Sequence, residues 1–284
     1  MKKIALVLSS GGAKGYAHIG AIKAIEEKGY EITSIAGTSM GALIGGLYAA
    51  GKLDEAYRWF KGIDNWGMFE LADVKNISPN GLINGEYIFA ELRKIVGDVR
   101  IEDLRIPFCC VAADLDTGEE VVFTKGRLLD AIRASVSLPG FFKPYKIGHR
   151  RYIDGGVVNG LPINRVRRQR GDSVIAINLD TYGKESSSPV IQTLLSAILG
   201  GAMVSISPLL SLLTPLLSGE NALTVILDAL YISLKQNKLA MVEREHPEVY
   251  VNIDLKGYST HNFSDAEAIV KLGYNQLRRE LYSL

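Results

Sequence analysis

Residues 32–50 read I-T-S-I-A-G-T-S-M-G-A-L-I-G-G-L-Y-A-A, a short β-type run, a tight turn and an apolar helical run. The turn is Gly37-Thr38-Ser39-Met40-Gly41, a G-x-S-x-G pentapeptide. A nucleophile on a sharp strand-to-helix turn needs glycine on both sides, because a side chain there would clash. The pattern predicts that Ser39 presents its hydroxyl at a sheet edge, with the backbone N–H of Met40 directed toward a reacting carbonyl group.

The residues before this turn repeat the same order of strand and helix. Residues 4–8 are an apolar run that predicts a strand, and isoleucines at helical spacing predict a helix over 15–28. A crossover between two such strands is nearly always right-handed and makes the strands parallel. The loops at 9–15 and 37–41 should therefore emerge at one edge, where the ligand sites of open α/β sheets lie.

The rest of the chain continues the alternation. Further strands are expected at 108–113, 120–123, 145–147, 151–153 and 174–178, with hairpin turns at 116–119 and 148–149. Further helices are expected over 53–62, 85–96, 127–136 and 263–281. The predicted fold class is α/β, a parallel-rich central sheet flanked by helices with an apolar helical C-terminal segment. We expect one domain over 1–284, made of a catalytic core (4–180), an apolar helical segment (186–245) and a C-terminal strand and helix (248–284).

Composition narrows the class of protein. The chain has 284 residues, 47% of them hydrophobic, and a net charge of +1, which argues against a nucleic-acid partner. Cys109 and Cys110 are adjacent within an apolar run, so we interpret them as reduced core thiols, which fits a cytoplasmic protein. The run at 4–8 is too short for an export signal. No acidic or histidine cluster has metal-ligand spacing, so neither a metal nor another cofactor is expected.

A glycine-rich loop, Ser9-Ser10-Gly11-Gly12-Ala13-Lys14-Gly15, follows the first strand. Such a loop exposes backbone N–H groups at a helix N-terminus, where anions bind. Three interpretations remain open at this point: an oxyanion hole for an ester intermediate, a dinucleotide-binding turn and a plain tight turn. The dinucleotide fingerprint fits poorly, because Ser10 stands where it needs glycine. Lys14 would add positive charge or brace the loop.

A third motif, Asp154-Gly155-Gly156, ends the strand expected at 151–153. It could place a carboxylate beside a neighbouring loop, although such tripeptides often only turn the chain. The four histidines offer a base for Ser39, and the order Ser39, Asp154, then His246 or His261 could fit an α/β-hydrolase triad. That fold places its nucleophile after several strands, whereas Ser39 follows the second. The remaining two are His149, in a predicted turn, and His18, interpreted as bracing a helix face or loop.

Taken in order, these motifs resemble those of the patatin-like phospholipases, in particular the bacterial members. That family carries a glycine-rich loop with Lys or Arg, then G-x-S-x-G, then D-G-[GA]. Further segments that look like the family are Ala17–Gly20, Ala113–Gly118, Ser137–Phe142 and Asn159–Pro162. The resemblance covers residues 4–180 and resumes faintly around 248–275. One departure is Ser10, where the family often has glycine, and serine fits there unless φ is positive.

The resemblance implies a serine esterase with a Ser–Asp dyad and no catalytic histidine. Ser39 would be the nucleophile and Asp154 the general base. The backbone N–H groups of Gly11, Gly12 and Met40 would form the oxyanion hole, and Lys14 and Gly15 would support the loop. The implied substrates are phospholipids or lysophospholipids.

Residues 186–219 carry no charge, and apolar pairs recur there at nearly helical spacing. A solvent-facing helix should be charged on its outer side, and Pro208 and Pro215 leave neither half long enough for a comfortable membrane span. Three interpretations stay open: core helices, a dimer or lid surface, or a face in peripheral contact with a membrane. Each could line an acyl-binding pocket.

Two other functions remain as alternatives. An acyl-carrier-protein transacylase resembles this family in fold but usually has histidine before its nucleophilic serine, where this chain has Thr38. An acyltransferase of that kind would use the same nucleophile. A lipid-sensing module without activity could keep all three motifs, and only an activity measurement separates it from an enzyme.

Overall fold

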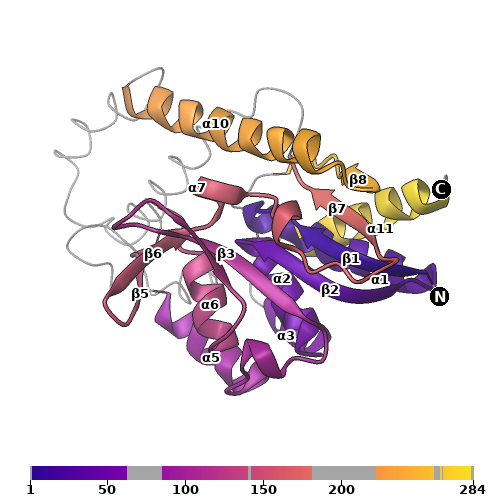
Figure 1. Ribbon diagram of the computed structural model, residues 1–284, viewed down its shortest axis with the longest axis horizontal. Coiled ribbons are helices and arrows are strands. Elements are labelled where there is room, and N and C mark those ends of the chain that lie inside the picture. Colours follow the sequence, from indigo (N-terminus) through magenta and orange to yellow (C-terminus); the bar gives the residue numbers. More distant parts are fainter. Residues whose placement is uncertain are drawn as a thin grey trace.

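The computed structural model describes residues 2–62, 85–139, 142–180, 222–258, 263 and 265–282 (Figure 1). Eight strands of the described chain form one sheet in the order β5-β6-β3-β2-β1-β7-β8, with β4 paired to β3. Their bounds are β1 Lys3–Leu8, β2 Glu31–Thr38, β3 Phe108–Asp114, β4 Glu120–Phe123, β5 Tyr145–Ile147, β6 Arg150–Asp154, β7 Ser173–Asn178 and β8 Val249–Asn252.

The central part of the sheet is parallel, as predicted. β1 pairs in parallel with β2 and with β7, and the parallel pairs β2–β3 and β7–β8 extend the sheet on either side. The antiparallel pairs β3–β4, β3–β6 and β5–β6 lie toward one side. The chain therefore winds outward in both directions from β1, and the loop after β1 opens where ligands bind in such sheets.

Helices lie on both sides of the sheet (Figure 1). The α-helices are α1 Tyr16–Glu27, α2 Met40–Ala49, α3 Leu53–Lys61, α5 Glu86–Val96, α6 Leu128–Ser135, α7 Gly156–Asn159, α10 Ala222–Glu245 and α11 Ala266–Tyr282. The short 3-10 helices are η1 Gly12–Gly15, η3 Ile101–Asp103 and η4 Ile163–Arg165. α10 belongs to the crossover from β7 to β8 and packs against α7 and η4.

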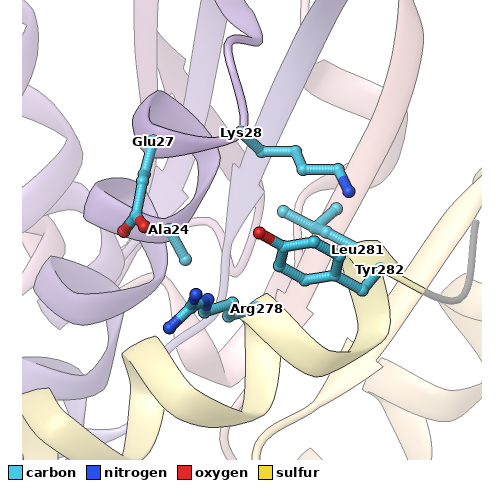
Figure 2. A pocket seen from close by; sticks show the side chains of 6 residues that line it. All are labelled: Ala24, Glu27, Lys28, Arg278, Leu281 and Tyr282. Carbon is cyan, nitrogen blue, oxygen red and sulfur yellow. The ribbon is translucent and has the colours of Figure 1, made fainter.

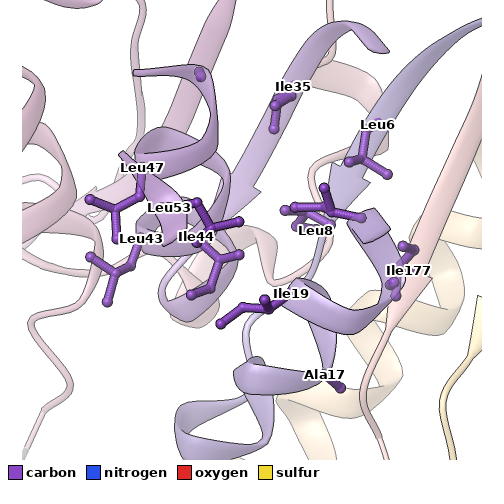
Figure 3. Packing of buried hydrophobic residues seen from close by; sticks show 14 of the residues in the cluster. Leu6, Leu8, Ala17, Ile19, Ile35, Leu43, Ile44, Leu47, Leu53 and Ile177 are labelled. Atoms are coloured by element: carbon purple, nitrogen blue, oxygen red, sulfur yellow. The ribbon is translucent and has the colours of Figure 1, made fainter. Parts of the chain in front are cut away.

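The alternation of side chains along β1 explains the two layers of core. Leu6 and Leu8 point to one face and pack in a cluster with residues of α1 and α2 (Figure 3). The same cluster includes residues of α6 and α11. Val7 points to the other face, where it clusters with Ile163 of η4 and Met241 of α10. Apolar residues on both faces are what a parallel strand covered on two sides requires.

Two glycines bring α1 and α11 into close contact. A Cβ on Gly20 would lie 1.9 Å from the Val270 carbonyl oxygen, and one on Gly273 would lie 2.2 Å from that of Ala17. The predicted C-terminal helix over 263–281 is thus present, but it begins at Ala266. Asp265 precedes it and accepts the first amide hydrogen bond with its carbonyl group, from Ile269.

The other expected strands and helices are present within a few residues of their predicted bounds. The turns at 116–119 and 148–149 join β3 to β4 and β5 to β6, as predicted. Cys109 and Cys110 are buried, unpaired thiols in β3. The uncharged segment 186–219 lies outside the described residues. Of the segment expected over 186–245, the structure describes α10, Ala222–Glu245.

Candidate active site

Ser39 lies on a tight turn between β2 and α2 with φ 55° and ψ −119°. A positive φ is rare for a residue with a side chain and signals a constrained backbone. The flanking glycines make the turn possible: a Cβ on Gly37 would lie 2.4 Å from the Gly41 carbonyl oxygen, and one on Gly41 would lie 2.2 Å from that of Leu8. The predicted serine turn is therefore present, with no space for side chains at either glycine.

Strand register brings Asp154 to Ser39 across 115 residues of sequence. Thr38 pairs with Val111 of β3 from one side, and Asp154 pairs with the next β3 residue, Ala112, from the other. The Ser39 hydroxyl donates a hydrogen bond of 2.5 Å to Oδ2 of Asp154. The structure thus brings together two of the predicted site residues, a hydroxyl and its acceptor.

The Asp154 carboxyl group is buried, with 3% of the residue exposed. Burial raises its pKa from 3.8 to about 6. Hydrogen bonds from the Ser39 hydroxyl and from the Gly156 N–H to Oδ1, at 2.7 Å, oppose this rise, as does the positive charge of Lys238. A carboxyl group with this pKa is mostly ionised at neutral pH and still takes up a proton readily.

Ser135, at the end of α6, also holds the turn. Its Oγ donates to the Val111 carbonyl oxygen at 2.6 Å and accepts the Ser39 N–H at 2.8 Å. Thr38 Oγ1 donates to the carbonyl oxygen of Asn159 at 2.8 Å and so fastens β2 to the end of α7. Ser135 could not be identified from sequence, because nothing near it in the chain indicates contact with a residue 96 positions away.

The glycine-rich loop lies directly beside the serine turn. A Cβ on Gly15 would lie 1.9 Å from Met40 Cγ, and one on Gly11 would lie 2.8 Å from Leu179 Cδ1. Gly12 adopts φ 55°. In the part of the chain that the structure describes, the backbone N–H groups of Gly11, Gly12 and Met40 donate to no protein acceptor. They remain available to an anionic oxygen.

Ser10 fits this loop without a positive φ, since the described non-glycine residues with positive φ are Ser39 and His246. Its N–H donates to the Gly160 carbonyl oxygen at 2.8 Å. Its Oγ would lie 3.5 Å from a Cβ on Gly156. The glycine-rich loop and the Asp154-Gly155-Gly156 motif therefore lie next to each other. Lys14 of the same loop is buried.

None of the described histidines is hydrogen-bonded to the Ser39 hydroxyl, which donates to Asp154. His18 is fully buried and its Nε2 lies 2.9 Å from the Ser9 carbonyl oxygen, so it braces the glycine-rich loop, in agreement with the interpretation from sequence. Burial lowers its pKa to about 4, which keeps it neutral. His149 lies in the β5–β6 turn, and His246 follows α10 near the start of β8, toward the amino ends of the strands. His261 lies outside the described residues.

A small surface depression lies at the opposite edge of the sheet, between the C-terminal ends of α1 and α11 (Figure 2). It is lined by charged and aromatic side chains, among them Glu27, Lys28, Arg278 and Tyr282. Lys28 Nζ lies 3.7 Å from the centre of the Tyr282 ring. These residues precede β2, whereas Ser39 follows it, so the depression is separate from the Ser39 site.

Within the described residues, no group of three acidic, histidine or cysteine side chains could hold a metal ion. None of the described helices is long and apolar enough to cross a membrane.

Comparison with known proteins identifies the class. The family model described as patatin-like phospholipase matches residues 6–166, more than half of the chain. Solved structures include VipD from Legionella pneumophila, which shares the fold with a TM-score of 0.53 and 16% identity over all of this chain and 67% of that one. The chain belongs to the patatin-like phospholipase family.

Curated relatives of this chain include proteins named for the NTE family and for neuropathy target esterase. An uncharacterized NTE family protein of Mycobacterium tuberculosis is 45% identical over 178 residues, which are 63% of this chain and 49% of that protein. The neuropathy target esterase of Drosophila melanogaster is 34% identical over 184 residues, 62% of this chain and 13% of its own. The aligned region thus spans about half or less of these relatives.

Proposed function

We propose that this protein is a serine esterase that cleaves the carboxylic ester bonds of phospholipids or lysophospholipids. Membership of the patatin-like phospholipase family supports the general class of lipid acyl hydrolase. The observation that carries the proposal is the 2.5 Å hydrogen bond from the Ser39 hydroxyl, on its strained turn, to the buried Asp154 carboxylate. A serine and its base in this relation are the minimum that nucleophilic acyl transfer needs.

In the acylation step, Ser39 Oγ attacks the ester carbonyl carbon and its proton passes to Asp154 Oδ2. The carbonyl oxygen becomes an oxyanion, which the N–H groups of Gly11, Gly12 and Met40 would stabilise. One donor of this kind contributes about 10²–10³ in rate. Collapse of the intermediate breaks the bond to the leaving alkoxide, which takes the proton back from Asp154.

In the deacylation step, a water molecule attacks the Ser39 acyl ester and gives its proton to the Asp154 carboxylate. A second oxyanion forms at the same three N–H groups. When it collapses, the fatty acid leaves and Ser39 recovers its proton from Asp154. If an alcohol replaced the water, the same acyl-enzyme would give acyl transfer, so hydrolase and acyltransferase differ in the acceptor.

The experiment that tests the function measures products released from phospholipids, lysophospholipids and p-nitrophenyl esters. We expect free fatty acid from at least one lipid class and p-nitrophenol from short esters. In labelling by a fluorophosphonate, Ser39 Oγ should bond to phosphorus with release of fluoride, so the peptide that contains Ser39 should gain the mass of the phosphonyl group in place of the hydroxyl hydrogen. The absence of both turnover and labelling, in folded protein, would leave the lipid-sensing alternative.

We expect kcat/KM for a soluble ester to fall as pH decreases through about 6. Only the ionised Asp154 accepts the Ser39 proton, and its pKa is raised to about 6, so activity is present above this pH and lost below it. The measurement is a pH profile of initial rates. Return to neutral pH must restore activity, which separates titration from unfolding. A profile that stays flat well below pH 6 would contradict Asp154 as the base.

Residues 186–219 are proposed, from sequence alone, to help the enzyme reach lipid packed in a membrane. Burial of apolar side chains contributes about 25 cal/mol per Å², so a few leucines on a bilayer would matter. Replacing Leu209, Leu212 and Leu216 with serine should lower activity on phospholipid vesicles while activity on a short ester and thermal stability hold. If stability collapses instead, these leucines belong to the core or a subunit contact.

A further inference from the structure

Lys238 is a buried cation on the inner face of α10. Among the α10 side chains that the structure describes, it is the one that is buried, with 6% of the residue exposed. Lysine is almost never buried unless it is paired. Its Nζ lies 2.5 Å from Oδ1 of Asp180, just after the end of β7.

Polar groups at the carboxyl ends of β7 and β8 hold Asp180 in place. Asn178 Nδ2 donates to Asp180 Oδ2 at 3.1 Å and lies 3.2 Å from the Tyr250 hydroxyl. Asn252 accepts the Asp180 N–H and donates to its carbonyl oxygen, at 3.1 and 2.7 Å. Asp180 is thus anchored from two strands and holds its charge beside Lys238.

The stem of Lys238 lies over the segment that joins the site motifs. A Cβ on Gly160 would lie 3.1 Å from Lys238 Cγ and 3.2 Å from its Cδ, so the methylene groups pack on Gly160. The Gly160 carbonyl oxygen accepts the Ser10 N–H at the start of the glycine-rich loop. Lys238 therefore packs on Gly160, which follows the Asp154 motif in the chain and is hydrogen-bonded to the loop of the proposed oxyanion donors.

We propose that Lys238 is a positioning residue that, paired with Asp180, fixes α10 against the site and supplies positive charge that favours the ionised form of the Asp154 carboxyl group. The proposal rests on the proposed Ser39–Asp154 chemistry. It extends the site to a helix far along the chain from the three motifs, and it makes catalysis depend on the docking of α10.

The electrostatic part has a definite sign. Lys238 lowers the pKa of Asp154, together with the Ser39 hydroxyl and the Gly156 N–H. The pKa of His18, on α1, is lowered mainly by burial and also by the charge of Lys238, so His18 stays neutral. Removal of the lysine charge leaves Asp180 as a buried anion and should raise the pKa of Asp154. Removal of the Asp180 charge leaves the cation unneutralised and should lower it.

The test compares Lys238→Met, Asp180→Asn and the double variant by the pH profile of kcat/KM for a soluble p-nitrophenyl ester. We expect the acid limb of Lys238→Met to move to higher pH by at least about half a unit. The limb of Asp180→Asn should move to lower pH, and that of the double variant should lie between them. Lys238→Arg, which keeps the charge, should return the limb toward that of the unaltered protein.

Arg168→Met is the matched control, since it removes a cation from the Arg168–Glu248 ion pair. This pair lies at the amino ends of β7 and β8, whereas Asp180 follows the carboxyl end of β7. Its acid limb should not move. If Lys238→Met does not fold, the downward shift of Asp180→Asn, a nearly isosteric change, decides alone. Limbs that stay fixed, or that move in the same direction in both single variants, overturn the proposal and leave a purely structural ion pair. If the unaltered protein is not labelled at Ser39, the proposed function itself would be refuted.

Discussion

Replacement of Ser39 by alanine should lower ester hydrolysis by at least about 10³, because the proposed attacking oxygen is removed and water must react without an acyl-enzyme. No described residue offers a second hydroxyl hydrogen-bonded to Asp154. Turnover of a short ester and of lysophospholipid, together with fluorophosphonate labelling, measures the loss. Labelling should disappear with activity, since both depend on the same oxygen.

The fold should survive this change. Alanine loses the hydrogen bond to Asp154, and the free energy of unfolding should fall by no more than about 3 kcal/mol, the upper end of the range for one bond to a charged group. Ser173→Ala, at the amino end of β7, is the matched control and should keep full activity. A purified Ser39→Ala protein that keeps near-normal turnover, once contaminating esterases are removed, would show that Ser39 is not the nucleophile.

The serine turn could be predicted from sequence because its requirements are local. Gly37 and Gly41 are close to Ser39 in the chain, and the clash that excludes other residues arises from backbone within the turn and from the neighbouring strand β1. The order of strands and helices was equally accessible, since buried parallel strands are short apolar runs. The bracing role of His18 also follows from its place directly after the glycine-rich loop.

The partners that meet through strand register could not be predicted from local patterns. The Asp154 motif alone is also a common turn. Its contact with Ser39 depends on the β3 register, in which Asp154 pairs with Ala112, the residue after the Val111 partner of Thr38. Ser135 reaches the same turn from α6, and Lys238 reaches Asp180 from α10, 58 residues further along the chain. These contacts depend on tertiary packing, for which a single sequence carries no periodic signal.

Replacement of Asp154 by asparagine should lower kcat by about 10²–10⁴, the contribution of a general base. Asparagine has nearly the same shape and can still accept the Gly156 N–H, but its amide cannot take a proton from Ser39. The histidine variants His18→Ala, His246→Ala and His261→Ala should each cost much less. If one histidine variant is as inactive as Ser39→Ala, the site is a catalytic triad that includes this histidine, and the proposed dyad is wrong.

The same substitution should have the opposite effect on stability. Because the pKa of Asp154 is raised from 3.8 to about 6 in the folded protein, its ionised form is disfavoured by about 3 kcal/mol at neutral pH. A raised carboxyl pKa contributes stability below the unfolded value, and that contribution is lost as pH rises through about 6. Asp154→Asn should therefore unfold at higher denaturant concentration than the unaltered protein at pH 7, with the difference shrinking toward pH 4.

A less active and more stable Asp154→Asn protein would indicate that the buried carboxylate is retained for chemistry at a cost in folding free energy. Denaturant unfolding at several pH values, run beside the activity assay, makes the comparison. Ser39→Ala provides the contrast, because it removes activity while leaving the buried carboxyl group in place. If Asp154→Asn instead destabilises the protein as much at pH 7 as at pH 4, the carboxylate serves the fold, and the activity loss would no longer identify Asp154 as the base.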